Sequence, residues 1–218
     1  MTRSIQNIVF DLGGVLLEWR PDQILAQLYP EDRETQALVQ REVFQHSDWL
    51  ALDKGMLAEE EAIRLFRQRT GRPLSEMKKL MDTVRETLIP IPPTFALLEE
   101  LSKDGMALYC VSNMQNNVFA YLQKRYDFWG KFKGLVISAH VRMIKPDVEI
   151  FNHLFSRYGL VPSACLFIDD HPPNVESARR LEMEAILFRG ADDCRRELQK
   201  RYHLLHRNET DQFSSAEP

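Results

Sequence analysis

Four short stretches of this 218-residue chain carry side chains that could act together in catalysis. Three of them directly follow an apolar run typical of a buried strand, and the fourth lies in a loop after another such run. The side chains are those of Asp11, Ser112, Asn113, Lys145, Asp169 and Asp170. Several carboxylates placed together repel one another unless a divalent cation neutralises them, and hard oxygen ligands suit Mg²⁺. A lysine and a hydroxyl beside them suit a phosphate, so the set predicts a site for a metal ion and an anion.

The first of these stretches lies in an apolar run from Ile8 to Leu16 that contains one acid and two glycines. A charge beside a buried strand is costly unless it is paired or coordinated, so Asp11 is expected at the exposed end of the strand. Gly13 and Gly14 allow a positive φ and a close backbone approach to a small ligand. The alternative is an acid at an ordinary turn, and taken singly the other stretches also suit turns, helix caps or solvated loops.

The elements that position these side chains follow from the hydrophobic pattern. Beyond residue 94 strands and helices alternate, which is typical of a parallel sheet covered by helices on both faces. Strands are expected at 106–111, 134–138, 164–168 and 184–188, in addition to the first one. In such sheets ligands bind beyond the carboxyl ends of the strands, where the four stretches converge. The predicted fold is α/β with a Rossmann-like parallel sheet.

A helical block interrupts this pattern after the first strand. Apolar residues at helical spacing predict four helices, at about 22–29, 32–46, 58–70 and 75–88, with a turn at Asp53-Lys54-Gly55. The proline-rich segment 89–93 is expected to be an extended return linker. The predicted division is therefore a core of residues 1–17 and 89–205, an inserted helical domain of residues 18–88, and a disordered tail of residues 206–218.

Composition restricts the class of protein. The formal net charge of −4 argues against non-specific binding to nucleic acid or to an anionic membrane, and no apolar run is long enough to span a bilayer. The first residues leave no room for a signal peptide, so a cytoplasmic monomer or small homo-oligomer is expected. Cys110, Cys165 and Cys194 lack metal-binding spacing and are predicted to be reduced thiols.

The four stretches resemble the four motifs of the haloacid dehalogenase-like hydrolase superfamily. The matching segments are Phe10-Asp11-Leu12-Gly13-Gly14-Val15, Val111-Ser112-Asn113, Lys145-Pro146-Asp147 and Phe167-Ile168-Asp169-Asp170. The resemblance implies that the helical block is a C1-type cap, which closes over the active site and selects substrates. Within it, Asp53-Lys54-Gly55 resembles the specificity loop of that cap.

The resemblance also implies a reaction, which is the Mg²⁺-dependent hydrolysis of a small phosphomonoester. Asp11 would attack phosphorus in line to form an aspartyl-phosphate, which water then hydrolyses. Ser112 and the Asn113 backbone would bind phosphoryl oxygens, as would positions Leu12 and Gly13. Lys145 would neutralise both Asp11 and the transferring group.

The same resemblance implies a set of ligands for Mg²⁺. They would be Asp11, the Gly13 carbonyl and Asp170, and Asp169 would reach the ion through water. Asn174 would either orient these acids or Lys145, or serve as a plain helix N-cap.

Gly13 departs from the pattern of the superfamily. Most of its phosphatases carry a second aspartate there, which protonates the leaving group and is typically worth about 10² to 10⁴ in rate. Without it, esters with good leaving groups are expected as substrates, such as anomeric sugar phosphates or acyl phosphates. The glycine also resembles a sub-group of bacterial hydrolases similar to glucose 1-phosphate phosphatases. Three residues of the helical block are candidates to replace the missing acid: His46, Asp48 and Asp53.

Two other functions remain open at this point. Carbon–halogen hydrolysis shares the aspartate, Ser-Asn and lysine but needs no metal, and the adjacent pair Asp169-Asp170 argues against it. The other alternative is a non-catalytic binding protein, for which Gly13 is the evidence.

Overall fold

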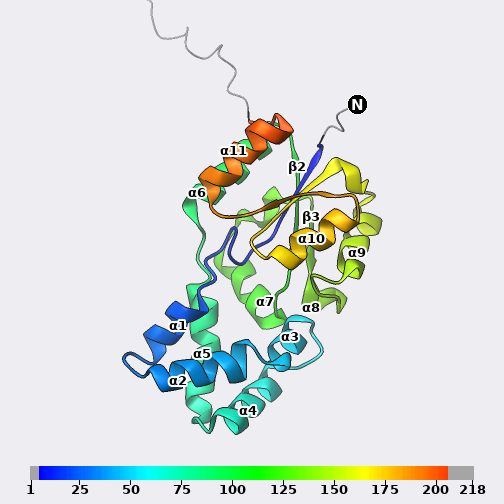
Figure 1. Cartoon of the computed structure of the whole chain (residues 1–218). Helices are drawn as coiled ribbons and strands as arrows, with labels where there is room; N and C mark the ends of the chain where they lie inside the picture. The colour runs from blue at the N-terminus through cyan, green and yellow to red at the C-terminus, as the bar shows by residue number, and fades with distance from the viewer. Residues whose placement is uncertain (1–4, 206–218) are drawn as a thin grey trace, which may run out of the picture.

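A five-stranded parallel sheet lies at the centre of the protein, as a computed structural model that describes residues 5–205 shows (Figure 1). The strand order is β3-β2-β1-β4-β5. The bounds are β1 (Asn7–Phe10), β2 (Ala107–Ser112), β3 (Gly134–Ile137), β4 (Cys165–Asp169) and β5 (Glu184–Leu187). The expected strands and their parallel arrangement are thus confirmed. The predicted disorder of residues 206–218 concerns a segment outside the described residues.

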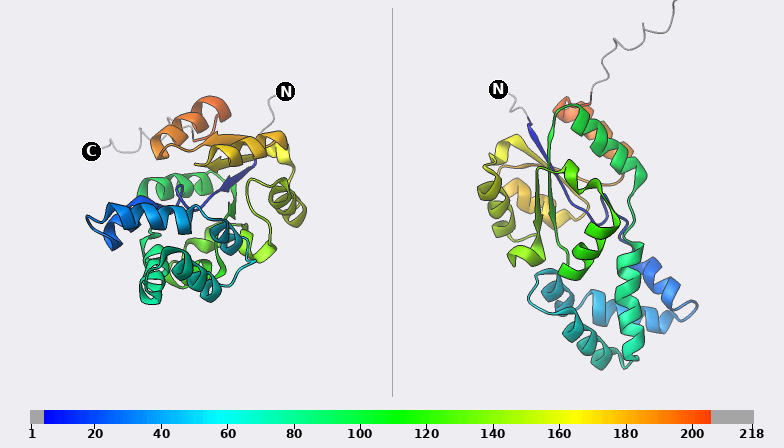
Figure 2. Two further views of the ribbon diagram at one scale, coloured as in Figure 1. Left: turned by 60° about the horizontal axis from the view of Figure 1, so that its bottom comes forward. Right: turned by 180° about the vertical axis from the view of Figure 1, so that it is seen from behind.

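Helices cover both faces of the sheet (Figure 2). Successive residues of a strand point to opposite faces, so Ile8 and Phe10 pack on one side of β1 and Val9 on the other. The first face is covered by α6 (Pro92–Lys103), α7 (Asn116–Arg125) and α11 (Ala191–Tyr202). The second is covered by α9 (Val148–Tyr158) and α10 (Pro172–Arg180). This arrangement is the Rossmann-type fold that the alternating pattern predicts.

The helices between β1 and α6 form a separate group, below the sheet in Figure 1. They are α1 (Pro21–Leu28), α2 (Arg33–Val39), a π-helical turn η1 (Gln40–Phe44), α3 (Ser47–Asp53), α4 (Glu59–Thr70) and α5 (Leu74–Thr87). These helices have their own apolar core, in which Phe66, Met77 and Leu80 are fully buried. None of the helices in the described residues is long and apolar enough to cross a membrane.

Helix α3 is an addition to the four predicted helices. It spans Ser47–Asp53, a segment to which no helix was assigned, and the turn expected at Asp53-Lys54-Gly55 begins at its last residue. The sequence pattern misses it because it has only seven residues, too few to show a helical period. His46 accepts a hydrogen bond from the Asp48 N–H at its start, and Trp49 and Leu52, three residues apart, bury its inner face.

The two crossings between the sheet and the helical group are hydrogen-bonded to each other. The Glu18 N–H donates to the Ile89 carbonyl over 2.8 Å, and the Ile91 N–H donates to the Leu16 carbonyl over 2.9 Å. Between these bonds Leu17 pairs with Pro90 in an antiparallel bridge. The chain therefore leaves the sheet part and returns to it at one place.

Candidate active site

The topology places three of the four motif stretches next to one another. Strand β1 lies between β2 and β4, and Phe10 is in register with Cys110 on one side and Ile168 on the other. Asp11 follows Phe10 directly, and its N–H donates to the Ile168 carbonyl over 3.0 Å. The carboxyl ends of the three strands thus bring Asp11, Ser112 and Asp169 to the same edge, as the sequence pattern predicts.

Asp11 is at the end of β1, but it is buried rather than exposed, with 8% of its surface accessible. The expected position at the end of the strand is confirmed, but this end is not exposed, because a counter-charge is buried with the carboxylate. The Lys145 Nζ lies 2.8 Å from Asp11 Oδ1 and 2.6 Å from Asp169 Oδ2. Asp11 Oδ1 also accepts the N–H of Leu12 over 2.7 Å. An ammonium ion shared by two carboxylates offsets much of the desolvation cost of all three groups.

The ionisation of these groups reflects burial and mutual charge. The pKa of Asp11 is raised to about 7, mainly by burial. The negative charge of Asp169 raises it further, and the positive charge of Lys145 opposes both effects. Burial alone would lower the pKa of Lys145, but the charges of Asp11 and Asp169 outweigh that effect and raise it. Lys145 therefore carries a positive charge at any physiological pH.

The loop that carries Lys145 is fixed by the side chain of Asn113. Its Nδ2 donates to the Lys145 carbonyl over 2.9 Å, and its Oδ1 accepts the Lys145 N–H over 2.8 Å. On the far side, the Ser177 hydroxyl of α10 donates to the Pro146 carbonyl. Asn113 thus holds the lysine backbone in place, and like Ser112 it lines the cavity at the site.

Asp169 is oriented by a second set of donors. Asn174 Nδ2 lies 3.0 and 3.1 Å from its two oxygens, and the His171 N–H donates to Oδ1 over 2.8 Å. Asn174 lies within α10, and His171 occupies the N-cap position of that helix. Of the two alternatives for Asn174, the geometry therefore supports orientation of Asp169 rather than helix capping.

Three carboxylates at this edge fit a divalent cation. Ligand oxygens of Asp11, Asp169 and Asp170 all lie within 4.8 Å of one another. Gly14 has a φ of +80°, and a Cβ at this position would overlap the Asp170 carboxylate. The turn after Asp11 and the acid pair after β4 are therefore as close as glycine permits. Such an all-oxygen donor set suits Mg²⁺.

Gly14→Ala tests this close approach. An alanine held at this positive φ should lower the free energy of unfolding by about 1–2 kcal/mol. Its Cβ should also displace Asp170, so added Mg²⁺ should stabilise the variant less than it stabilises the unchanged protein. Gly71→Ala is the matched control, because Gly71 also has a positive φ, +67°, but no atom within 4 Å of the added Cβ. Urea unfolding over a Mg²⁺ titration measures both effects. A Gly14→Ala variant with the Mg²⁺ response of Gly71→Ala would contradict the assignment.

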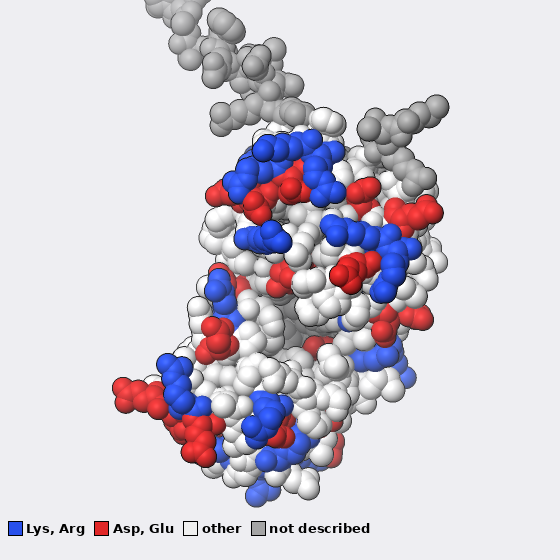
Figure 3. Space-filling view, in the orientation of Figure 1, with Lys and Arg blue, Asp and Glu red and all other residues white. Residues whose placement is uncertain are grey.

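A cavity of about 440 Å³ opens above these groups, between the sheet part and the helical group. Figure 3 shows the surface hollowed between these two parts. Asp11, Gly13, Ser112, Asn113, Lys145, Asp170 and Asn174 line its inner end. Leu12 and Asp169 are fully buried and do not line it. The cavity therefore contacts most of the predicted site residues, and Leu12 contributes through its bond to Asp11.

Of the three acid–base candidates in the helical group, only Asp53 lines this cavity. Asp48 forms an ion pair with Arg69 of α4, and the His46 ring caps α3. Burial raises the pKa of Asp53 to about 7; a hydrogen bond from Gln115 lowers it, and the charge of Asp11 raises it.

The loop that begins at Asp53 docks on the sheet part. The Ser138 hydroxyl donates to the Asp53 carbonyl and accepts the Met114 N–H over 2.8 Å. At Gly55, with φ +68°, a Cβ would overlap the Ala139 carbonyl. The sequence reasoning did not single out Ser138 or Gln115. Ser138 directly follows the third strand, which is the signal that could have found it.

The strand order and the carboxylate cluster together define a Rossmann-type α/β protein with a candidate metal site at the carboxyl edge of its sheet. Within that class, the chain belongs to the haloacid dehalogenase-like hydrolases, whose family model matches residues 8–188. The resemblance seen in the four motifs is thereby confirmed at the level of the family.

Two curated relatives are phosphatases by name. The sesquiterpene phosphatase astK of Aspergillus oryzae is 26% identical over 84% of this chain and 89% of its own length. The D-ribitol-5-phosphate phosphatase of Bacteroides thetaiotaomicron is 26% identical over 89% of this chain and 97% of its own.

A solved structure from the same bacterium shares the fold. It is a HAD-family enzyme in its magnesium complex, 22% identical, with a TM-score of 0.74 over 90% of this chain and 100% of that one. The same enzyme has also been crystallised with magnesium and inorganic phosphate. The cluster of Asp11, Asp169 and Asp170 in this chain fits the predicted Mg²⁺ cofactor.

Proposed function

We propose that this protein is a Mg²⁺-dependent phosphatase that hydrolyses a small phosphomonoester. The observation that carries the proposal is the buried Asp11–Lys145–Asp169 ion cluster, with Asp170 beside it, at the inner end of a cavity large enough for a small molecule. A carboxylate nucleophile and a phosphate dianion repel each other, so a fixed ammonium ion beside them suits phosphoryl transfer.

In the proposed mechanism Asp11 attacks phosphorus and retains the phosphoryl group until water releases it. Ser112, the Asn113 main chain and Lys145 bind the phosphoryl oxygens. Asp11, the Gly13 carbonyl and Asp170 would hold Mg²⁺, and Asn174 keeps Asp169 oriented beside it. When bound, the ion would neutralise charge on the phosphoryl group. The segment 18–88 serves as a C1-type cap that excludes water during the first step.

A screen of phosphate release from a panel of phosphomonoesters, with and without Mg²⁺, tests this function. We expect turnover that depends on Mg²⁺ and is abolished by chelation. Absence of phosphate release over the whole panel at every accessible pH would favour the non-catalytic alternative. Chloride release from a 2-haloacid without Mg²⁺ would instead favour dehalogenation.

We further propose that Asp53 supplies the proton that Gly13 cannot. Among the described residues of the helical group, Asp53 is the carboxylate that lines the cavity. The Ser138 hydroxyl holds its backbone in place, and the negative charge of Asp11 raises its pKa. With a pKa of about 7, it would hold its proton in the first step and accept one in the second. This arrangement would remove the expected restriction to esters with good leaving groups.

Asp53→Asn is therefore expected to have an effect that depends on the leaving group. kcat/KM should fall about 10²- to 10⁴-fold for an alkyl phosphate and much less for p-nitrophenyl phosphate, whose leaving group needs no proton. For the unchanged enzyme, kcat/KM with the alkyl ester should rise and then fall around pH 7, because Asp11 must lose its proton to act as nucleophile and Asp53 must keep its own. The falling limb should disappear in Asp53→Asn, while the rising limb of Asp11 should remain. Lys145, Asp170 and His171 face the cavity in both proteins.

Asp82→Asn is the matched control for Asp53→Asn. Asp82 is another acid of the helical group; its side chain is 62% accessible, pairs with Arg85 and does not line the cavity. Its loss should leave kcat/KM for both esters and the pH profile unchanged. Equal losses on both esters in Asp53→Asn would point to a docking role for the loop instead of proton transfer.

A further inference from the structure

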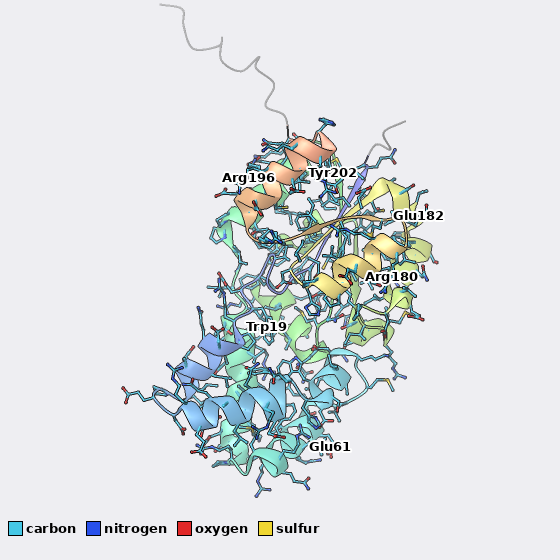
Figure 4. The ribbon with its side chains drawn as sticks, in the orientation of Figure 1. Trp19, Glu61, Arg180, Glu182, Arg196 and Tyr202 are labelled. Atoms are coloured by element: carbon cyan, nitrogen blue, oxygen red, sulfur yellow. The ribbon has the colours of Figure 1, made fainter. Side chains whose placement is uncertain are left out.

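The outer part of the cavity is apolar. Beyond the phosphate end, its wall comes from α3, α5, η1 and the crossing after β1, through Trp19, Phe44, Trp49, Leu50, Val84 and Leu88. Figure 4 labels Trp19 at the junction of the sheet part and the helical group. The group that the phosphate carries would therefore contact mainly hydrocarbon.

Packing between aromatic rings holds this wall in place. The Trp19 and Trp49 rings are stacked with centroids 5.9 Å apart, and Phe44 meets Trp49 edge to face at 4.8 Å. Behind them Trp49 packs on Phe66 in the core of the helical group. Rings packed on both sides rotate little, so the cavity presents a preformed apolar surface rather than one that adapts to hydroxyl groups.

Few polar groups interrupt this surface. Away from the phosphate end, the polar side chains of the helical group that line the cavity are Gln40 and Asp53, and Gln115 faces them from the sheet part. Asp53 and Gln115 already bond to each other, which leaves Gln115 Oε1 as a buried acceptor without a partner among the described residues. A sugar would place several hydroxyls here, and each one left unpaired lowers affinity roughly five- to a hundredfold.

The charges of the lining also restrict the phosphate. Among the described residues that line the cavity, Lys145 is the one lysine or arginine. It is already shared by Asp11 and Asp169. A second phosphate, as in a diphosphate or nucleotide, would find no further lysine or arginine in this lining, which also carries Asp53 and Asp170.

We infer that the substrate is the monophosphate ester of a predominantly apolar alcohol, with a straight, branched or aromatic hydrocarbon group, and not a sugar phosphate or a diphosphate. The inference rests on the proposed phosphatase function and names the class of its leaving group. The two curated relatives bear the names of a terpene phosphatase and a polyol phosphatase, and the cavity of this chain favours the apolar class.

Binding of unreactive analogues tests the substrate class separately from turnover. n-Alkylphosphonates from butyl to octyl are titrated into the Mg²⁺-loaded protein by calorimetry. Each buried methylene should tighten Kd about three- to fourfold until the cavity is full, and the heat capacity change should become more negative with chain length. Binding to the Asp11→Asn variant is then compared for D-ribitol 5-phosphate, glucose 6-phosphate and octylphosphonate. Both sugar phosphates should bind this variant at least tenfold more weakly than octylphosphonate does.

A matched pair of variants locates the apolar contact. Leu50 lines the cavity and is 57% exposed, so Leu50→Asn should not disturb folding and should weaken octylphosphonate binding about three- to tenfold. Met56 is 63% exposed and does not line the cavity, so Met56→Asn should bind like the unchanged protein.

The possible outcomes distinguish a failure of the apolar substrate class from a failure of the proposed phosphatase function. A Kd that does not change with chain length, or tighter binding of either sugar phosphate, overturns the apolar class even if the enzyme releases phosphate. A steep chain-length dependence without phosphate release from octyl phosphate supports the apolar site and counts against the phosphatase.

Discussion

Asp11→Asn should abolish turnover, with phosphate release lowered by roughly 10⁴-fold or more, because an amide cannot act as the nucleophile. The substitution preserves shape, and the amide oxygen can still accept the Leu12 N–H that Asp11 Oδ1 now accepts. Loss of one negative charge also relieves repulsion from Asp169. The folded state should therefore persist while the reaction stops, which phosphate-release kinetics and thermal unfolding measure together.

Asp193→Asn is the control for this experiment, because Asp193 lies on α11 away from the cavity, has 45% of its side chain accessible and pairs with Arg196 in the next helical turn. It should retain full activity. Mass spectrometry of the acid-quenched enzyme during turnover should find a phosphoryl group on Asp11 in the unchanged protein and none in Asp11→Asn. Turnover by Asp11→Asn above about one hundredth of the original rate would refute the assigned nucleophile.

Lys145→Met should be the most destabilising substitution at the site, with a loss of about 3–5 kcal/mol in the free energy of unfolding. The methionine side chain fills similar space, but Asp11 and Asp169 would then be buried together without a counter-charge. Mg²⁺ should recover part of this stability, since it supplies the missing positive charge. Urea unfolding in chelator and in excess Mg²⁺ measures both the loss and the recovery.

Lys54→Met provides the comparison, because Lys54 also forms an ion pair with an aspartate. That pair is long and exposed, with 40% and 50% of its side chains accessible, and should contribute about 0–1 kcal/mol. The two variants remove the same group from buried and exposed pairs. Similar losses in both would show that Asp11 and Asp169 are not held by the charge of Lys145.

Much of the fold could be predicted because the strands are strongly apolar and regularly separated by helical patterns. β1 and β4 are buried on both faces, and such strands leave a clear signal in the sequence. The apolar run that begins at Ile8 continues beyond β1, however, since Leu12, Leu16 and Leu17 are buried in a turn rather than a strand. Hydrophobicity indicates burial, and it does not by itself separate a strand from a packed turn.

The carboxyl-edge residues could be predicted because parallel topology brings strand ends together. The burial of Asp11 could not, because it depends on a lysine 134 positions further along the chain that approaches from another loop. The same holds for Asp53, whose place in the cavity depends on how α3 packs against Ser138. Contacts between the helical group and the sheet part involve orientations that a local pattern does not encode.

The paired crossings between the sheet part and the helical group determine how the cavity can open. Two independent crossings would let the helices twist and slide relative to the sheet part. Here the Glu18–Ile89 and Leu16–Ile91 hydrogen bonds join both crossings into a single pivot. The opposite side of the interface is held by the loop at Asp53 and Gly55. Release of that loop would leave the helical group joined to the sheet part at this pivot and at the hydrogen bond from Arg125 of α7 to the Glu86 carbonyl, so the mouth would widen at α3 while Trp19, close to the pivot, stayed nearly fixed.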